Sequence, residues 1–299
     1  MSSAGSTMGR AVSTEVSAEP PGGGGAVVRC DGAALAYGRS TVLTGVTGQV
    51  APGTALALIG PNGSGKTTLL RGLLGMVDVV AGRIEVCGRA PGRAQRGSIG
   101  YVPQVADLDP SFPVTVLDVV LMGTYSRLGL LRRPGREERR RCREALEGVG
   151  LDDLASRRFG TLSGGQRQRV LVARCIAADP RLILLDEPFN GLDQPNRTAL
   201  LGIIERLKER GIGVVVSTHD LVLARRTCEK AALLAGRQIA FGPREEVLVP
   251  ALVEQAYGGP GSDLLIGLGP LPAAPGGGAS DGDRGNDSES IPGNDEERP

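Results

Sequence analysis

The feature that most limits what this chain can fold into is a glycine-rich loop set between an apolar run and a helical pattern. The apolar run is Ala55 to Ile59, and directly after it comes Gly60-Pro61-Asn62-Gly63-Ser64-Gly65-Lys66-Thr67. A buried strand leading through glycines into a helix predicts a β–loop–α unit. The glycines let backbone N–H groups curl around phosphate oxygens, and the start of the next helix turns its positive end toward them.

Further apolar runs predict more strands, at Ser98 to Val102, Leu182 to Leu185 and Gly213 to Ser217. Between the last two runs, four apolar residues recur at i, i+3, i+4 and i+7, and Gly211 follows as a cap: Leu200, Ile203, Ile204 and Leu207. Strands that alternate with helices predict an α/β fold with a mixed, largely parallel sheet and flanking helices. Together with the glycine-rich loop, this indicates a RecA-like P-loop NTPase.

Composition divides the chain into segments. Residues 1–25, rich in Ser, Gly, Ala and Pro, and the acidic residues 270–299 are expected to be disordered, because they bury too little to offset ordering entropy. An inert acidic tail is favoured over an interaction arm. The main domain is expected at 26–250 and a C-terminal extension at 251–269. Residues 105–160 predict an inserted helical subdomain. Its arginines predict a solvated face more than a docking face: Arg132, Arg133, Arg136, Arg139, Arg140, Arg141 and Arg143.

Two segments carry the chemistry of a nucleotide site. Lys66, one of three lysines in the chain, would reach the β- and γ-phosphates, and the Thr67 hydroxyl would hold Mg²⁺. The run Leu182 to Leu185 ends in Asp186 and Glu187. It would place Asp186 beside the Mg²⁺ and Glu187 where it can take a proton from an attacking water. The ordinary alternatives are a plain glycine-rich turn and a strand that ends in surface acids. The occurrence of both segments in one chain favours a nucleotide site over these alternatives.

Two further polar residues follow predicted strands. His219 comes two residues after Ser217, at the strand end where parallel sheets build sites, and a γ-phosphate contact is preferred over a purely structural role. Gln104 follows the Ser98 to Val102 strand and could contact both Mg²⁺ and the attacking water.

A second glycine-rich loop stands between these two segments. Leu162-Ser163-Gly164-Gly165-Gln166 precedes a helical pattern at 167–178, which Asp179-Pro180 closes. Ser163 is a suitable N-cap, and two glycines leave bare N–H groups at the helix start, which makes a second anion site. One fold cannot easily aim both loops at one phosphate, whereas two molecules placed head to tail can. A capped helix with a flexible start is the plainer interpretation.

Taken in order, these segments resemble the ATP-binding cassette family over roughly residues 27–245. In this resemblance Tyr37 matches the aromatic residue that stacks on adenine, Gly60 to Thr68 the phosphate loop, and Gln104 the Q-loop. The signature is matched by Ser163, Gly164, Gly165 and Gln166, and the D-loop by Asp193. Asp186, Glu187 and His219 match the magnesium aspartate, catalytic base and switch histidine. Asn190-Gly191-Leu192 departs slightly from the usual residues before the D-loop aspartate.

The resemblance implies an ATP hydrolase with Mg²⁺ that closes as a dimer of two identical copies around two ATP molecules. It also implies transmembrane permease subunits as partners, on the cytoplasmic face of the membrane. The stretch from Phe112 to Gly123, followed by Leu128 to Pro134, resembles the subfamily that takes up manganese, zinc and iron with an extracytoplasmic solute-binding protein.

Several alternatives stay open at this point. They are an exporter ATPase for a drug or lipid, a non-transport ABC ATPase, and a small-molecule kinase. The segment between Lys66 and Ser163 is too short for the long coiled coils of DNA-repair relatives, and a kinase leaves Leu162 to Gln166 unexplained. A net charge of +1 argues against a nucleic-acid partner. Five scattered cysteines predict small buried residues in a reducing compartment. The sequence predicts neither a membrane span nor a secretory signal, so a soluble subunit is expected.

Overall fold

The computed structural model describes residues 25–104, 112–128 and 133–259. The chain divides into two units, Met1–Gly267 and Leu268–Pro299, and all described residues belong to the first. The tails predicted at 1–25 and 270–299, apart from Gly25, lie outside the described residues, and so does Arg132.

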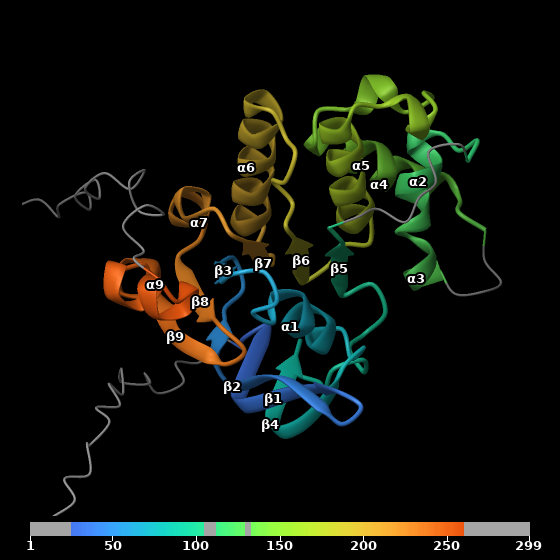
Figure 1. Ribbon diagram of the computed structural model, residues 1–299. Helices are drawn as coiled ribbons and strands as arrows, with labels where there is room; N and C mark the ends of the chain where they lie inside the picture. The colour runs from blue at the N-terminus through green and yellow to red at the C-terminus, as the bar shows by residue number, and fades with distance from the viewer. Residues whose placement is uncertain (1–24, 105–111, 129–132, 260–299) are drawn as a thin grey trace, which may run out of the picture. The chain divides into compact units, whose positions relative to one another are not determined.

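A six-stranded sheet forms the centre of the first unit, in the order β5-β6-β7-β3-β8-β9 (Figure 1). Five neighbouring strands are parallel, and only the edge strand β9 runs antiparallel to β8. The strands are β3 (Ala55–Ile59), β5 (Ile99–Val102), β6 (Leu182–Asp186), β7 (Gly213–Thr218), β8 (Lys230–Leu234) and β9 (Gln238–Pro243). All four strands expected from the sequence are present, and the largely parallel α/β fold is confirmed.

The central strands form because they are apolar on both faces. Every residue of β3, β6 and β7 is buried, as a parallel sheet covered by helices requires. The covering helices include α1 (Lys66–Leu73), α6 (Gln194–Glu209) and α7 (Leu221–Thr227). In α6 the predicted stripe of Leu200, Ile203, Ile204 and Leu207 is buried. Gly211 follows the helix with φ +77°, and its N–H bonds the Lys208 carbonyl, which confirms the predicted cap.

A second, antiparallel sheet was not expected from the sequence. It has the order β2-β1-β4 and consists of β1 (Val28–Tyr37), β2 (Ser40–Val50) and β4 (Asp78–Val86). Helix α1 packs against this sheet and also against β6 of the central sheet, so it lies between the two (Figure 1). The helix that follows the glycine-rich loop therefore belongs to both halves of the core.

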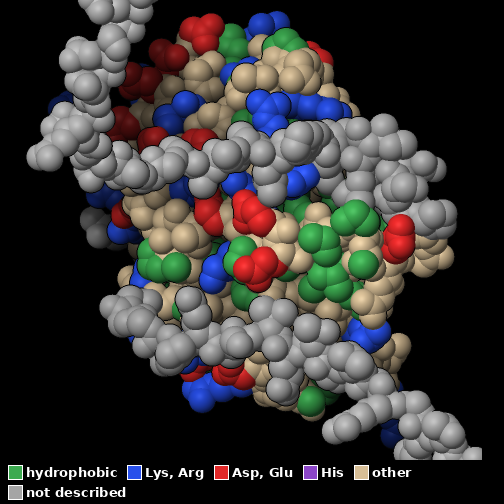
Figure 2. Space-filling model, turned by 90° about the vertical axis from the view of Figure 1, so that its left-hand side faces the viewer, with side chains coloured by type: hydrophobic (Ala, Val, Ile, Leu, Met, Phe, Trp, Pro, Cys, Tyr) green, Lys and Arg blue, Asp and Glu red, His purple; other side chains and the backbone are tan. Residues whose placement is uncertain are grey.

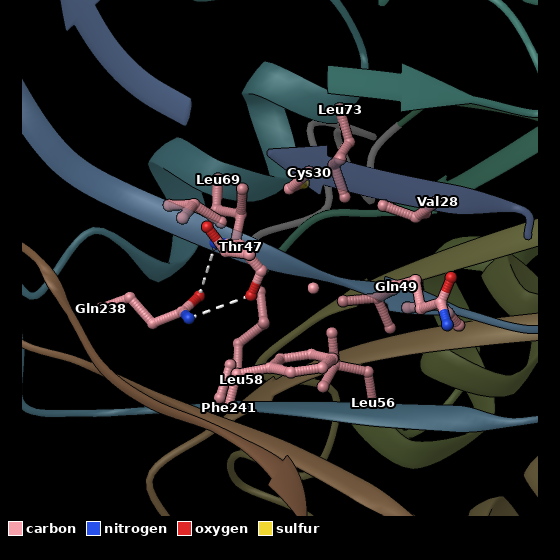
Figure 3. Close-up of a pocket in the computed structure, with 15 residues that line it drawn as sticks. Val28, Cys30, Thr47, Gln49, Leu56, Leu58, Leu69, Leu73, Gln238 and Phe241 are labelled. Atoms are coloured by element: carbon pink, nitrogen blue, oxygen red, sulfur yellow. Dashed lines mark hydrogen bonds between the residues drawn. The ribbon is translucent and has the colours of Figure 1, made fainter. Parts of the chain in front are cut away.

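The two sheets also meet directly where β2 passes β9 (Figure 3). Gln238 accepts a hydrogen bond from the Thr47 N–H at 3.2 Å and donates one to the Thr47 carbonyl at 2.9 Å. Next to it, the ring of Phe241 lies so close to Gly48 that an added Cβ would approach it to 2.6 Å. Behind these contacts is an apolar cavity between the sheets, whose lining includes Leu56, Leu58, Leu69 and Cys30. This cavity is not the phosphate site.

Helices occupy the stretch between β5 and β6. They are α2 (Val116–Met122), α3 (Tyr125–Leu128), α4 (Arg136–Gly148) and α5 (Gly164–Ala177), with short 3₁₀ turns at Asp152–Leu154 and Phe159–Thr161. Helices α2, α4 and α5 pack on one another, and α5 also reaches β5 and α6. Helix α2 begins with a capping box in which Thr115 and Asp118 satisfy each other's backbone N–H groups.

The arginines of α4 lie mostly at the surface, where Arg140 and Arg141 pair with Glu137. Pairs of this kind, three or four residues apart on an exposed helix, contribute little to stability because water screens them. Basic and acidic side chains also alternate across the face shown in Figure 2. This mixed surface agrees with the near-zero net charge.

The chain continues from β9 into two short helices, α8 (Arg244–Val247) and α9 (Pro250–Tyr257). Helix α9 packs on β8 and β9. Within the described residues, no helix is long and apolar enough to cross a membrane. The five cysteines are free thiols, and four of them are buried, in agreement with the expected role as small core residues.

Candidate nucleotide-hydrolysis site

The glycine-rich loop adopts backbone angles that side chains other than glycine rarely tolerate. Gly60, Gly63 and Gly65 have φ of +157°, +80° and +102°. An added Cβ at Gly60 would lie 2.1 Å from the Leu234 carbonyl oxygen, so a side chain cannot be accommodated there. The loop leads from the end of β3 into α1, which begins at Lys66. Backbone N–H groups at the start of a helix form an anion site.

Lys66 is buried at the centre of this loop. Its ammonium group donates to the carbonyl oxygens of Gly60 at 2.8 Å and Pro61 at 3.1 Å. It also lies 3.6 Å from Oε1 of Glu187, and both side chains are less than a tenth exposed. The structure therefore brings the predicted phosphate-binding lysine and the predicted base together, although Lys66 begins α1 and Glu187 follows β6.

Asp186 ends β6 beside the start of α1. Its Oδ1 accepts hydrogen bonds from the Thr67 hydroxyl at 3.2 Å and from the Ser217 hydroxyl at 2.6 Å. Ser217 lies opposite Asp186 in the β6–β7 register, so the strand pairing itself sets this contact. The Ser217 oxygen also accepts from the Glu187 N–H at 2.8 Å. One serine thus positions both acidic residues.

Glu187 holds a strained backbone conformation, with φ +48°. Such a conformation costs about 1 kcal/mol or more for a residue with a side chain, and it persists only where the surroundings fix it. Here two bonds from the Glu187 N–H, to the carbonyl and hydroxyl oxygens of Ser217, fix it. The carboxylate lies between Lys66 on one side and His219 on the other. Its Oε2 lies 3.0 Å from His219 Nδ1.

His219 and Gln104 both lie where the sequence predicts, at the carboxyl ends of strands. The His219 side chain is 58 % exposed, so one edge of the ring faces Glu187 and the rest stays accessible. Gln104 is exposed two residues beyond β5, which pairs with β6 through Val102 and Leu185. Gln104 thus follows the strand adjacent to the one that ends at Asp186.

Tyr37 ends β1 and is 44 % exposed. A hydrogen bond with Tyr37 raises the pKa of Arg71, a residue of α1, and a smaller contribution comes from Tyr101. Tyr101 in turn lies near Asp186. Burial raises the pKa of the Tyr101 phenol, and the Asp186 carboxylate raises it further.

The second glycine-rich loop is built as predicted at its helix start. Ser163 caps α5, its hydroxyl accepting from the Gln166 N–H at 3.2 Å while the Gln166 side chain accepts from the Ser163 N–H at 3.0 Å. Leu162 is buried, whereas Ser163 and Gly164 are exposed. Among the described residues, no hydrogen bond or ion pair joins this loop to Gly60–Thr67. Figure 1 shows α5 grouped with α2 and α4, away from α1.

The start of α5 instead contacts the start of α6. Asp193 caps α6 and accepts from the Asn196 N–H at 3.0 Å and from its side-chain amide at 2.7 Å, and the backbone bond lowers the Asp193 pKa. Arg169 of α5 donates to the Asn196 amide oxygen at 3.3 Å. Asn196 also fills the space where a Cβ of Gly165 would be, at 2.3 Å. Gly165 is needed here for close packing.

Three contributing residues were missed from the sequence. Ser217 was assigned only as the end of a strand, and Asn196 and Arg169 were not singled out. Ser217 could have been found, because it precedes His219 at the carboxyl end of a strand, where parallel sheets place functional side chains. Asn196 follows Asp193 by three residues, the spacing of a capping contact. Nothing in the sequence around Arg169 indicates its partner on another helix.

The arrangement can perform one kind of chemistry. A buried lysine and a loop of bare N–H groups can bind phosphate, and a hydroxyl and a carboxylate oxygen lie together next to them. A second carboxylate, 3.0 Å from an imidazole nitrogen, could accept a proton from water. The fold and the site define a nucleotide hydrolase of the P-loop class.

Comparison with known proteins places the chain within this class. Residues 43–190 match the ABC transporter family. Over 232 residues the chain is 41 % identical to the manganese transport system ATP-binding protein MntB of Bacillus subtilis, covering 78 % of this chain and 92 % of that protein. It is also 41 % identical to the zinc transport system ATP-binding protein TroB of Treponema pallidum, covering 80 % and 90 %.

Solved structures agree. A chain from a metal-chelate type ABC transporter in an inward-facing conformation matches with a TM-score of 0.70 and 32 % identity, over 78 % of this chain and 89 % of that one. The chain therefore belongs to the ABC transporter family and is one of its ATP-hydrolysing subunits.

Proposed function

We propose that this subunit drives uptake of a transition-metal ion, manganese, zinc or iron, through separate transmembrane permease subunits. It acts at the cytoplasmic face of the membrane, and an extracytoplasmic solute-binding protein delivers the cargo to the permease. The observation that carries the cargo assignment is the identity of 41 % to ATP-binding proteins of manganese and zinc transport systems over about nine tenths of their length. In this proposal the metal is cargo of the permease.

The residues at the phosphate loop fit Mg²⁺ bound with ATP. Thr67 Oγ1 and Asp186 Oδ1 lie 3.2 Å apart, and hydroxyl and carboxylate oxygens are the ligands that Mg²⁺ prefers. Gln104 would join them from the end of β5. When bound, Mg²⁺ offsets negative charge on the β- and γ-phosphates.

The chain's own residues supply the remaining steps. The N–H groups of Gly60–Thr68 and the Lys66 ammonium bind the phosphates, and Tyr37 stacks on the adenine. Glu187 takes the proton from the attacking water, and His219 holds the Glu187 carboxylate and contacts the γ-phosphate. Ser217 keeps Asp186 and Glu187 in place through its bonds of 2.6 and 2.8 Å.

We infer that two identical copies close around two ATP molecules. The support is the exposure of Ser163 and Gly164 at a helix start. Within residues 25–104, 112–128 and 133–259, no hydrogen bond links this helix start to the same chain's phosphate loop. In the closed dimer, each γ-phosphate contacts Ser163, Gly164, Gly165 and Gln166 of the second copy. Asp193 lies at the adjoining helix start. Hydrolysis removes the γ-phosphate contacts, and the dimer opens.

The domain division follows the same proposal. Residues 26–250 form the ATPase domain, and the helices within 105–160 form a subdomain that transmits closure to the permease. Residues 251–269 form a C-terminal extension. The docking side includes the segment Phe112 to Gly123, whose sequence resembles the metal-uptake subfamily.

Uptake assays test the cargo and its direction. Cells lacking this chain would be supplied with the wild-type chain or with Glu187→Gln, and uptake of radioactive manganese, zinc and iron would be followed. Faster uptake of one of these metals, supported by the wild-type chain alone, is expected. Metal or drug efflux that depends on the wild-type chain, without any uptake, would mean that the subunit serves an exporter.

A further inference from the structure

The starts of α5 and α6 are joined by one asparagine side chain, which has no role in the scheme above. Gly165 and Arg169 lie at i and i+4 of α5, and therefore on the same face of that helix. Asn196 of α6 contacts both of them. Its amide fills the space that a Cβ of Gly165 would need, and its Oδ1 accepts from Arg169 Nη2 at 3.3 Å. The two helix starts are thus in direct contact.

The Asn196 amide has a defined direction, because its two polar neighbours differ in the bonds that they can form. The Asp193 carboxylate only accepts hydrogen bonds, and the Arg169 guanidinium only donates them. Asn196 therefore donates from Nδ2 to Asp193 Oδ1 at 2.7 Å and accepts from Arg169 through its Oδ1. The result is a continuous bridge from α5 to the residue that caps α6. Neither a carboxylate nor an apolar side chain at position 196 could form both bonds.

This bridge connects two features that the proposed dimer presents to the second copy. At one end, Ser163 and Gly164 are exposed at the start of α5. At the other end, Asp193 is exposed at the start of α6. Two loops that face the same second copy need a fixed spacing, because a small misplacement of either one weakens the contacts of both. The bridge supplies that spacing within one chain.

Stability alone does not account for the bridge. Arg169 is half-buried, and its Nε is buried without a hydrogen-bond partner among the residues that the structure describes. Burial lowers the pKa of Arg169, while the Asp193 carboxylate acts in the opposite direction. An unpartnered buried donor costs stability, and apolar side chains would join two helices without that cost. The guanidinium also donates to the Val149 carbonyl at the end of α4, at 3.0 Å, so it connects three helices.

We propose that Arg169 and Asn196 are positioning residues that hold the second glycine-rich loop and Asp193 at one fixed spacing, so that both meet the second copy in the same closing step. They act through the placement of the two helix starts and not on the reacting atoms. Their loss should therefore weaken the ATP-bound dimer without changing how each copy first binds nucleotide. This inference rests on the proposed dimer.

The test measures dimer formation separately from nucleotide binding. All variants are made in the full chain with Glu187→Gln as background, and light scattering over a range of protein concentrations gives the dissociation constant of the Mg-ATP dimer. Calorimetry measures the affinity for Mg-ADP, which lacks the γ-phosphate of the sandwich. Arg169→Met and Asn196→Ala should each raise the dimer dissociation constant about three- to tenfold, with the ADP affinity within about twofold.

The chain offers a matched control for each substitution. Arg206→Met is the control for Arg169→Met, because Arg206 of α6 also donates to a carbonyl at the end of α4, at 3.0 Å. Thr198→Ala is the control for Asn196→Ala, because Thr198 is exposed on the same helix. Both controls should match the background in the two measurements.

Two further variants separate the bridge from a general loss of packing. The double variant of Arg169→Met and Asn196→Ala should weaken the dimer no more than the more harmful single substitution, because both break the same bridge. Asn196→Asp keeps the size of the side chain and can still pair with Arg169, but it loses the donor to Asp193. It should weaken the dimer while the unfolding temperature stays within about 2 °C of the background, because an acid in the first turn of a helix is favourable.

An unchanged dimer dissociation constant in Asn196→Ala would overturn the proposal. So would single effects that multiply in the double variant, or an ADP affinity that falls by the same factor as dimer formation. If Glu187→Gln alone dimerises with ATP and the bridge variants dimerise equally well, the role of Arg169 and Asn196 is refuted and the sandwich stands. If Glu187→Gln alone forms no ATP-dependent dimer, the sandwich itself fails, and this inference falls with it.

Discussion

Glu187 is the residue on which the site converges, because a lysine, a histidine and a serine all meet it. Its backbone is strained, and bonds to Ser217 compensate for that strain. The sequence predicted the lysine, the histidine and the acid, since each falls in a motif or at a strand end. The role of Ser217 depends on which strands lie side by side, and β6 and β7 are separated in sequence by a helix.

Lys66→Ala should weaken ATP binding by about 100-fold, because a charged donor to the phosphates is lost. Isothermal titration calorimetry with ATP would measure this. Lys230→Ala is the matched control. Lys230 begins β8 and lies over the ring of Phe241 on β9, so its loss should leave the affinity unchanged. Wild-type affinity in Lys66→Ala would contradict the assigned role.

Ser217→Ala should lower the free energy of unfolding by about 1–3 kcal/mol, because the Asp186 carboxylate and the Glu187 N–H each lose a buried partner. Urea titration followed by circular dichroism would measure the loss. Ser40→Ala, at an exposed position of β2, should change stability by less than about 0.5 kcal/mol. Equal stabilities of the two variants would show that Ser217 is not a structural support.

At the scale of elements, apolar runs in the sequence predicted the strands and helices around the site. They did not predict the antiparallel sheet. The reason is visible in β2, where Gly45 and Gly48 have positive φ and the pairing with β1 shifts register three times. Each shift breaks the alternation of buried and exposed residues by which a strand is found in sequence. The helix start at Ser163 was predicted because capping is local, but its contact with Asn196 depends on the packing of two helices.

Ser163→Arg should produce a subunit that binds ATP normally but does not dimerise with it, because a bulky cation replaces an exposed cap at the second anion site. Light scattering coupled to gel filtration, with Mg-ATP and with Glu187→Gln as background, would reveal the oligomeric state. Ser126→Arg, at an exposed serine of α3, is the control and should still dimerise. An ATP-dependent dimer of Ser163→Arg would refute the sandwich arrangement.

At the scale of the molecule, one chain holds both a phosphate loop and a second glycine-rich loop, and no hydrogen bond joins the two within the part of the chain that the structure describes. In the proposed dimer, each copy contributes a different loop to each of two sites, so hydrolysis is expected to depend on assembly. The family and the largely parallel fold could be predicted from the order of motifs. The cargo could be predicted only through resemblance, because no motif in the sequence indicates which ion is transported.

Glu187→Gln should bind ATP, hydrolyse it about 100-fold or more slowly, and accumulate as a dimer of twice the subunit mass. The amide keeps the shape of the side chain and removes the proton acceptor. Phosphate release and light scattering would measure the two effects on the same sample. Turnover at the wild-type rate would remove Glu187 as the base.

The two hydrogen bonds between Thr47 and Gln238 bear on which ligand lengths the chain can accept. They fasten the antiparallel sheet to the edge of the central sheet, so neither sheet can slide without breaking both bonds. Tyr37 is carried by the first sheet and Gly60 by the second, and the span between them is thereby kept constant. With Tyr37 stacking on the adenine and Gly60 binding phosphate as proposed, a molecule whose ring and phosphates are spaced differently from those of a nucleoside triphosphate would contact only one of the two residues.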